Sequence, residues 1–356
     1  MNRKNRRCLS LFLAICMMLA CTLVPGAGAE DAGNEARIGE TEYATLGEAI
    51  DASKDGDTIT VLRDLTLTAI NKEIYKNITI DGGDAKYTVR ATGGYTFQFC
   101  DSFTLKNLKL DTQNGFRFWN TSRNGREAVV GTLENVEWTV GKGLFVNLQG
   151  EKTGIPQTLN IVRSTVTKTA VSGDPIIATY NKGGSDIAIN IEDSTLNQNG
   201  GQTNAHTGNK SMLFFYQKGN VTLNVKGSSA LNYQPLGKAD SVQALAVIGS
   251  ATVTVNLENT VRLHLAESEN ATAKHGFLYK DGSGTAAVND AGATWSATRA
   301  VAAEGILKPD FDSYNGETTV RWSLKDGDRF VSAGSESPFR YEATSETVLC
   351  RFSTYT

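Results

Sequence analysis

The chain has 356 residues, of which 40% are hydrophobic, so it is long enough to bury a sizeable core. Its 35 Lys and Arg residues stand against 38 Asp and Glu residues. This mildly acidic balance argues against a nucleic-acid partner, because such proteins carry a basic stripe.

Residues 1–29 have the pattern of a secretory signal peptide. Basic residues between Arg3 and Arg7 precede an apolar run from Leu9 to Val24, and Ala27-Gly28-Ala29 forms a small-residue cleavage site. We therefore expect a mature chain that starts at Glu30 and is secreted or associated with the cell surface. Lipid attachment at Cys21 is the alternative, although the three residues before it match a lipobox poorly. Removal of residues 1–29 leaves 31 basic and 38 acidic residues, a formal charge of −7, and no expected transmembrane span.

A short helix is predicted near residues 46–53. Thr45 and Glu48 have the spacing of a capping box, in which each side chain satisfies a backbone amide at a helix N-terminus. Asp55-Gly56-Asp57 then ends the helix and reverses the chain. From Ile59 to Leu67 apolar and polar residues alternate, which indicates a half-buried strand.

This opening, TLGEAIDASKDGDTITVL from Thr45 to Leu62, closely resembles the start of many secreted bacterial proteins of the pectin-lyase-like superfamily. The resemblance implies an all-β fold, a right-handed parallel β-helix whose open end is covered by the short helix. The matching residues include no catalytic residue of that superfamily, so the resemblance implies a fold more than an activity.

Internal repeats support a stacked architecture. An apolar-Asn-apolar pattern recurs, and its asparagines are Asn160, Asn190, Asn224, Asn256 and Asn289. A second polar position follows each of them closely, and we assign to it Ser164, Ser194, Ser228 and Asn259, with Asn107 and Asn135 upstream. Each repeat is then strand, polar turn, strand and variable connection. Stacking such repeats joins their apolar faces into one core, so residues 30–304 are predicted to form the β-helix.

The side chains expected inside the early coils are aromatic: Tyr95, Phe97, Phe99, Phe103, Phe116, Phe118 and Trp119. For Trp119 alone, a surface on which sugars stack is the alternative. Recurrent asparagine at turns is interpreted as structural, because its amide bonds the backbone and tolerates left-handed φ. The outward row that contains Thr222 and Asn224 faintly resembles the threonine arrays of β-helical ice-binding proteins, with Ala188 interrupting it.

Function is expected in the connections, since loops carry function more often than the scaffold beneath them. The long connections are 179–186, 197–210, 232–241 and 266–276. They follow equivalent strands, so we expect them on one side of the stack, lining one groove. The residues there that could bind a polyhydroxylated ligand such as a glycan are His206, Lys210, Tyr233, Lys238, Asp240, Lys274 and His275.

Signs of catalysis are weak. The superfamily's lyases use clustered aspartates that hold calcium, and its hydrolases use NTD, DD, HG and RIK sequence motifs. Of these motifs, this chain contains only the HG dipeptide, at His275-Gly276. Outward residues after the turn are expected to be Lys109, Glu137, Thr167, Asn197, Leu231 and Arg262, without carboxylates in neighbouring coils. A non-catalytic, adhesin-like binding protein is therefore favoured over a polysaccharide lyase or glycoside hydrolase. No catalytic residue can be assigned, and neither a metal nor a cofactor is expected, because the cysteines and histidines lack metal-site spacing.

The pattern changes near residue 305. Residues 305–356 contain Pro309, Pro338 and several strand-like pieces without the asparagine repeat. We expect a C-terminal β cap or small β module that closes the far end of the stack, which would otherwise expose strand edges. The oligomeric state and the identity of the ligand do not follow from the sequence.

Overall fold

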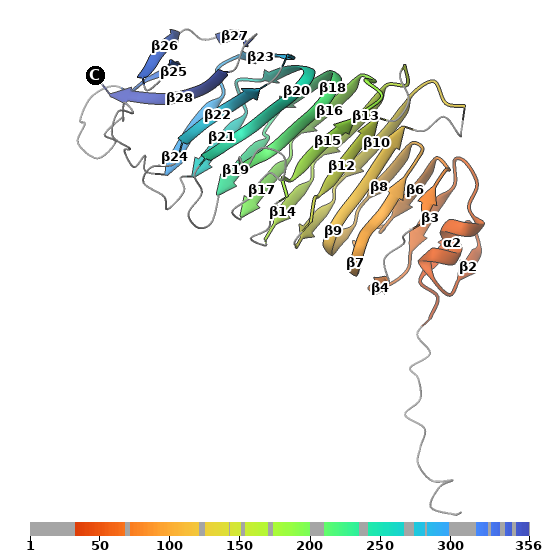
Figure 1. Ribbon diagram of the computed structural model, residues 1–356. Coiled ribbons are helices and arrows are strands. Elements are labelled where there is room, and N and C mark those ends of the chain that lie inside the picture. Colours follow the sequence, from red (N-terminus) through yellow and green to blue (C-terminus); the bar gives the residue numbers. More distant parts are fainter. Residues whose placement is uncertain are drawn as a thin grey trace, which may run out of the picture. The chain divides into compact units, whose positions relative to one another are not determined.

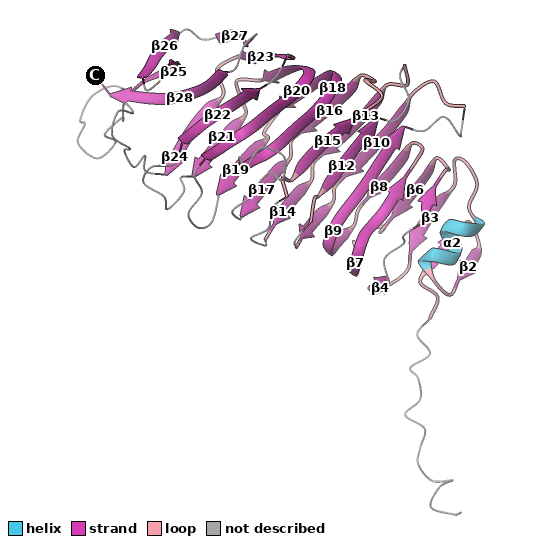
Figure 2. Ribbon diagram, viewed as in Figure 1, coloured by secondary structure: helices cyan, strands magenta, loops and turns pink. Residues whose placement is uncertain are grey.

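The computed structural model describes residues 33–67, 72–120, 125–141, 143–150, 154–169, 174–199, 210–234, 241–266, 274–281, 283–298, 318–326, 329–334, 339–343 and 347–355. For 199, 210, 234, 241–243, 265–266, 274–277, 279, 281 and everything from 295 onward, only the backbone is described. The predicted signal peptide and Cys21 lie outside these residues. From Glu35 the described residues belong to one compact unit that consists mostly of strands (Figure 2).

The predicted helix is present as α2 (Leu46–Ala52), the one helix among the described residues. Thr45 is its N-cap, and its hydroxyl accepts a hydrogen bond from the Glu48 amide at 3.1 Å, as the capping box predicts. A carboxylate from outside the helix adds to the cap, because Glu35 accepts from the Leu46 amide at 2.9 Å. The apolar stripe of α2 includes Leu46 and Ile50, which are buried in the core.

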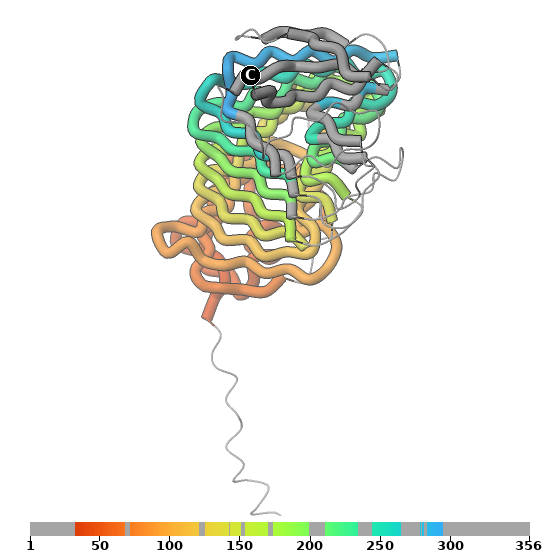
Figure 3. Tube along the Cα trace, turned by 90° about the vertical axis from the view of Figure 1, so that its left-hand side faces the viewer, coloured from red at the N-terminus to blue at the C-terminus, as the bar shows by residue number. Residues whose placement is uncertain are grey.

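The strands lie in three rows, and the chain passes through the first, second and third row in turn; we call one such passage a coil. Successive coils lie side by side in Figure 1 and one above another in Figure 3. Within each row the neighbouring strands of the described coils are parallel. This arrangement is consistent with a β-helix.

The first row contains β3 (Thr58–Val61), β6 (Ile78–Asp81), β8 (Phe103–Lys106), β10 (Val129–Glu134), β13 (Gln157–Val162), β16 (Ile187–Glu192), the second halves of β18 (Lys210–Lys226) and β20 (Ser241–Leu257), and β23 (Thr285–Asp290). The second row contains β4 (Leu65–Leu67), the first halves of β7 (Thr88–Phe99) and β9 (Lys109–Asn120), β11 (Glu137–Val140), β14 (Thr165–Lys168), β17 (Thr195–Asn199), β19 (Ala230–Gln234), β21 (Arg262–Ala266) and β24 (Thr294–Thr298). The third row contains β5 (Glu73–Ile74), the second halves of β7 and β9, β12 (Val146–Gly150), β15 (Ile177–Asn181), the first halves of β18 and β20, and β22 (Lys274–Asp281).

Antiparallel strands cover both ends of the first row. At the start, β1 (Ala36–Ile38) pairs with β3 and with β2 (Thr41–Tyr43). At the end, β27 (Phe339–Ala343) pairs with β23, and β28 (Thr347–Tyr355) pairs with β22 of the third row. β28 also pairs with β25 (Thr318–Asp326), which forms a hairpin with β26 (Arg329–Gly334). These pairings satisfy backbone groups that an open strand edge would leave unpaired.

The interior core is aromatic in the early coils. Phe99 and Phe103 stack with their ring centroids 3.9 Å apart, and Phe116 stacks on Trp138 at 5.4 Å. Five of the seven aromatic residues predicted to be inside are fully buried: Phe97, Phe99, Phe103, Phe116 and Phe118. Tyr95 and Trp119 are only partly buried and contact Arg117 outside the core, so their assignment to the core was wrong.

The repeated asparagines occupy one register position of the first row. Each of Asn190, Asn224, Asn256 and Asn289 donates its amide hydrogen to the side-chain oxygen of the preceding asparagine, at 2.7–2.8 Å. This asparagine ladder links five coils from Asn160 to Asn289 and confirms the predicted repeat. Its bonds run between side chains of successive coils and so link the coils themselves.

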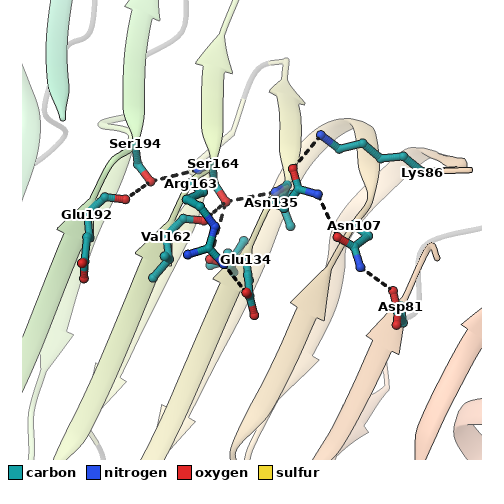
Figure 4. Close-up of polar contacts among 12 residues, drawn as sticks. Asp81, Lys86, Asn107, Glu134, Asn135, Val162, Arg163, Ser164, Glu192 and Ser194 are labelled. Atoms are coloured by element: carbon teal, nitrogen blue, oxygen red, sulfur yellow. Dashed lines mark hydrogen bonds and ion pairs between the residues drawn. The ribbon is translucent and has the colours of Figure 1, made fainter. Parts of the chain in front are cut away.

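The corner between the first and second rows holds two further ladders (Figure 4). Asn107 and Asn135 adopt left-handed φ of 52° and 55°, and their amides continue a chain of hydrogen bonds that starts at Asp81. Ser164 accepts from the Val136 amide, and Ser194 accepts from the Ser164 amide.

Two sequence-based alignments of this corner were wrong. Asn107 and Asn135 are equivalent to Arg163, Asp193 and Gly227, which share their left-handed φ, and not to the serines. The serine ladder continues to Ser229 instead of Ser228, because the turn after β18 has one more residue than the turn after β16.

Candidate functional site

Three of the four predicted connections join equivalent strands. They follow β17, β19 and β21 of the second row and precede β18, β20 and β22 of the third row. The remaining one, 179–186, instead leads from the third row to the first, and Thr179 is buried within β15. Since neighbouring strands in each row are paired, the ends that bound these three connections are adjacent.

The structure brings three of the seven predicted ligand-binding residues together at the start of the third row. The backbone of Lys210 pairs with Val242, which pairs with His275, and Lys274 pairs with Ser241. Lys210 therefore lies two coils from His275. His206, Lys238 and Asp240 lie outside the described residues.

Tyr233 lies where the sequence did not place it. It belongs to β19 rather than to a connection, and its side chain is only 1% exposed. It occupies the same inward position as Lys168 and Gln198 in the two preceding coils. Burial raises the pKa of its phenol. The ring packs in the interior and does not reach a ligand in the solvent.

A different group of residues lies on the outer face of the third row, and we call it the aromatic face: Tyr95, Arg117, Trp119, Asn147, Tyr180, Phe214 and Tyr216. Alternation along β9, β12, β15 and β18 turns the side chains from Arg117 to Tyr216 away from the core, because Phe116, Phe118, Ile177 and Phe215 point inward. Tyr95 of β7 joins them through its contact with Arg117, and the register of β7 is irregular just before it. Tyr180 and Tyr216 pair in register, and Gln149 separates Trp119 from them by one coil. At a strand spacing of about 4.8 Å, the row from Trp119 to Tyr216 spans about 14 Å.

Arg117 is the cationic centre of the aromatic face. Its guanidinium carbon lies 4.7 Å from the centroid of the Tyr95 ring and 4.9 Å from that of Trp119. One guanidinium nitrogen donates to Gln98 at 3.2 Å. In the next coil, the Asn147 amide donates to the Tyr95 hydroxyl at 3.1 Å. Contacts across three coils thus hold the rings in place.

An apolar cluster supports the other end of the aromatic face. Leu144, Ala178, Phe214, Ala246 and Ile248 form a cluster separate from the interior core, with Tyr180 and Tyr216 packed against it. The Phe214 and Tyr216 rings stack 5.7 Å apart, and Tyr180 meets Tyr216 edge-on at 6.1 Å. Burial, reinforced by Asp174, raises the pKa of Tyr180, so its phenol stays a hydrogen-bond donor at neutral pH.

A hollow of about 560 Å³ adjoins Tyr216. The side chains and backbone that line it are those of Lys182, Tyr216, Gln217, Lys218, Gly249, Ser250 and Ser283. A ligand that lies on Tyr216 could therefore reach lysine amines and a serine hydroxyl next to an aromatic ring.

A second hollow, of about 610 Å³, lies along the asparagine ladder, between Asn190 and Asn289. Lys226 and Glu258 are among the residues that line it, and Lys226 is paired with Glu192 at 2.8 Å. The neighbouring outward row reads Thr158, Ala188, Thr222, Thr254 and Ala287, so the faint likeness to a threonine array is interrupted twice. This face has no aromatic residue among those lining the hollow.

The expected outward row after the turn was partly out of register. Lys109 and Glu137 align with Thr165, Thr195, Ala230 and Arg262, and not with Thr167, Asn197 and Leu231. Leu231 is buried. Glu137, the carboxylate in this row, has its pKa lowered mainly by a hydrogen bond from Lys86, which does not suit a general acid.

The comparisons with known proteins gave no relative. No family model, no curated protein and no solved structure matched the chain. In the described ranges, no group of three or more His, Cys, Asp and Glu residues is placed to hold a metal ion. Nor do those ranges contain a helix with the length and apolar character needed to cross a membrane.

Proposed function

We propose that the chain is an exported right-handed parallel β-helix, of the pectin-lyase-like and cell-surface kind, that binds glycans without cleaving them. The proposed location, secreted or attached at the cell surface, rests on residues 1–29 of the sequence. The proposed fold class rests on the three parallel strand rows together with the N-terminal match. The observation that carries the binding proposal is the row of partly buried aromatic rings on the outer face of the third strand row.

Glycans suit such a face for two reasons. The C–H faces of sugar rings pack on aromatic rings, and their hydroxyl groups bond to nearby polar groups. Trp119, Tyr180 and Tyr216 supply the rings, and Arg117, Lys182 and Lys218 supply donors beside them. The row runs along the stack of coils, so it suits an extended polymer better than a single small molecule.

The predicted connections extend this surface. They lead into β18, β20 and β22, and the rings of Phe214 and Tyr216 belong to β18. His206, Lys210, Lys238, Asp240, Lys274 and His275 therefore remain proposed contacts at the margin of the aromatic face. Tyr233 is no longer among them because its ring is buried.

Retention on immobilised polysaccharides tests the proposal. The wild-type chain should be retarded by at least one member of a panel of neutral and acidic polysaccharides. Trp119→Ala and Tyr180→Ala should each weaken binding roughly fivefold, because each removes a stacking contact worth about 1 kcal/mol. Thr222→Ala and Thr254→Ala, on the outer face of the first row, serve as controls and should bind like wild type. Retention that the aromatic variants leave unchanged at unchanged melting temperature would reject the site, and release of new reducing ends would reject a non-catalytic role.

A further inference from the structure

Three polar atoms at one end of the aromatic face are buried and have no hydrogen-bond partner within the described part of the chain. They are Arg117 Nε, Trp119 Nε1 and Asn147 Oδ1. Asn147 is only 4% exposed. An unpaired buried polar atom costs about 1–3 kcal/mol, so a ligand group that bonds to all three atoms would recover that cost.

The three residues that carry these atoms are neighbours by register. Arg117 and Trp119 are alternate residues of β9 and therefore share its outer face, and Asn147 of β12 pairs directly with Arg117. Two are donors, since Nε and Nε1 each carry one hydrogen, and one is an acceptor. The ligand group must therefore accept two hydrogen bonds and donate one.

The Tyr95 ring covers this arrangement. It lies against the Arg117 guanidinium and its hydroxyl accepts from Asn147, so it contacts two of the three residues. Tyr95 follows exposed Gly93 and Gly94 at the point where the register between β7 and β9 shifts. Because these two glycines carry no side chain and the strand pairing is irregular there, the Tyr95 ring can turn aside with little steric hindrance.

We propose that Tyr95 closes over a subsite for the acetamido group of an N-acetylated amino sugar. The acetamido N–H donates to Asn147 Oδ1, and its carbonyl oxygen accepts from Trp119 Nε1 and Arg117 Nε. All three unpaired atoms are then satisfied by one group, and its methyl lies against aromatic rings. This inference rests on the proposed function, of which it specifies the ligand.

Other common glycan substituents fit less well. A carboxylate accepts from both donors but leaves Asn147 Oδ1 facing another acceptor. A protonated amine is repelled by Arg117. A hydroxyl group has the right number of lone pairs and hydrogens, but all three protein atoms must then converge on its single oxygen. It also lacks the methyl group with which an acetamido group contacts the aromatic rings.

Calorimetric titration with three matched tetrasaccharides tests this subsite: chitotetraose, its fully de-N-acetylated form, and cellotetraose. They share a β-1,4 backbone and differ at one position of the sugar, which carries an acetamido, an amino or a hydroxyl group. We expect chitotetraose to bind roughly tenfold more tightly than cellotetraose, since its extra contact with buried groups is worth about 1.4 kcal/mol. The de-N-acetylated form should bind most weakly. Equal affinities for chitotetraose and cellotetraose would overturn the subsite but leave glycan binding intact, whereas absence of binding to every polysaccharide would overturn the proposed function itself.

Variants separate the subsite from a structural role. Asn147→Leu and Trp119→Phe should reduce the preference for chitotetraose over cellotetraose to about threefold or less while cellotetraose binding persists. Asn220→Leu, at an exposed asparagine bonded to Asp186 in the first row, is the matched control and should keep the full preference. Tyr95→Phe keeps the covering ring but removes the hydroxyl that accepts from the Asn147 amide, so Asn147 is freer to turn toward the ligand. Chitotetraose should therefore bind to this variant as tightly as to wild type or more tightly. A preference that survives in Asn147→Leu with an unchanged melting temperature would refute the assignment.

Discussion

Lys168 provides a test of the interior of the stack, because it buries an ammonium group. Its side chain is 0% exposed, and Nζ donates to the carbonyl oxygens of Gly143 at 2.5 Å and Asp174 at 2.9 Å. Burial lowers the pKa of Lys168 from 10.5 to about 8, with Asp174 opposing the shift. The folded protein therefore releases this proton at a lower pH than the unfolded chain does.

The sign of the effect on stability follows from proton binding. Below about pH 8 both states hold the proton, so this group adds no pH dependence. Between about pH 8 and pH 10.5 the unfolded state holds more protons, and the free energy of unfolding rises with pH. At about 1.4 kcal/mol for each pKa unit, the rise is about 3 kcal/mol.

Urea unfolding at several pH values between 7 and 10.5 measures this rise. Lys168→Met removes the titrating group and keeps the length of the side chain. The free energy of unfolding of wild type minus that of the variant should increase by about 3 kcal/mol across the range. Gln198→Leu changes the equivalent buried position of the next coil without removing an ionisable group, and its profile should run parallel to wild type. A parallel profile for Lys168→Met as well would refute the buried ammonium.

Three further substitutions test the scaffold by chemical or thermal unfolding. Leu257→Asp places an unpaired charge at a position that is 2% exposed, so it should cost several kcal/mol, and unchanged stability would contradict the inward orientation of this strand. Asn224→Leu breaks two bonds of the asparagine ladder and should lower the free energy of unfolding by about 1–3 kcal/mol. Its control, Thr222→Ser on the same outer face, should stay within about 0.5 kcal/mol of wild type. Equal effects of the two substitutions would show that the ladder contributes little to stability. Thr45→Ala removes the N-cap of α2 and should lower the free energy of unfolding by about 1 kcal/mol. A loss below a few tenths of a kcal/mol would mean that Glu35 alone caps the helix.

The N-terminal helix and the first-row repeat could be predicted because each has a local signal. Thr45 and Glu48 mark a cap, and the recurrent asparagine marks one register position in successive coils. The prediction that Ser228 belongs to the serine ladder was wrong because one coil has a longer turn. Counting a fixed number of residues from the asparagine cannot reveal an inserted residue.

The third strand row was missed because its strands lack alternation. In β12, Val146, Asn147 and Leu148 are all buried, and in β15 Ile177, Ala178 and Thr179 are as well. When both faces of a strand are covered, the period-2 pattern disappears. The aromatic face lies on this row, so it could not be found from periodicity. The sequence offers one signal for this face, because Trp119 is the one aromatic residue of the early cluster for which sugar stacking is the alternative.

Hydroxyl-radical footprinting with mass spectrometry can show whether glycans bind on the aromatic face. Oxidation of individual residues is compared with and without the polysaccharide that retains the chain best. We expect the polysaccharide to protect Trp119, Tyr180 and Tyr216. Tyr43 and Tyr87, partly buried aromatic residues packed against the interior core, should be oxidised as before. Unchanged oxidation of Trp119, Tyr180 and Tyr216 while the polysaccharide is bound would contradict binding on this face.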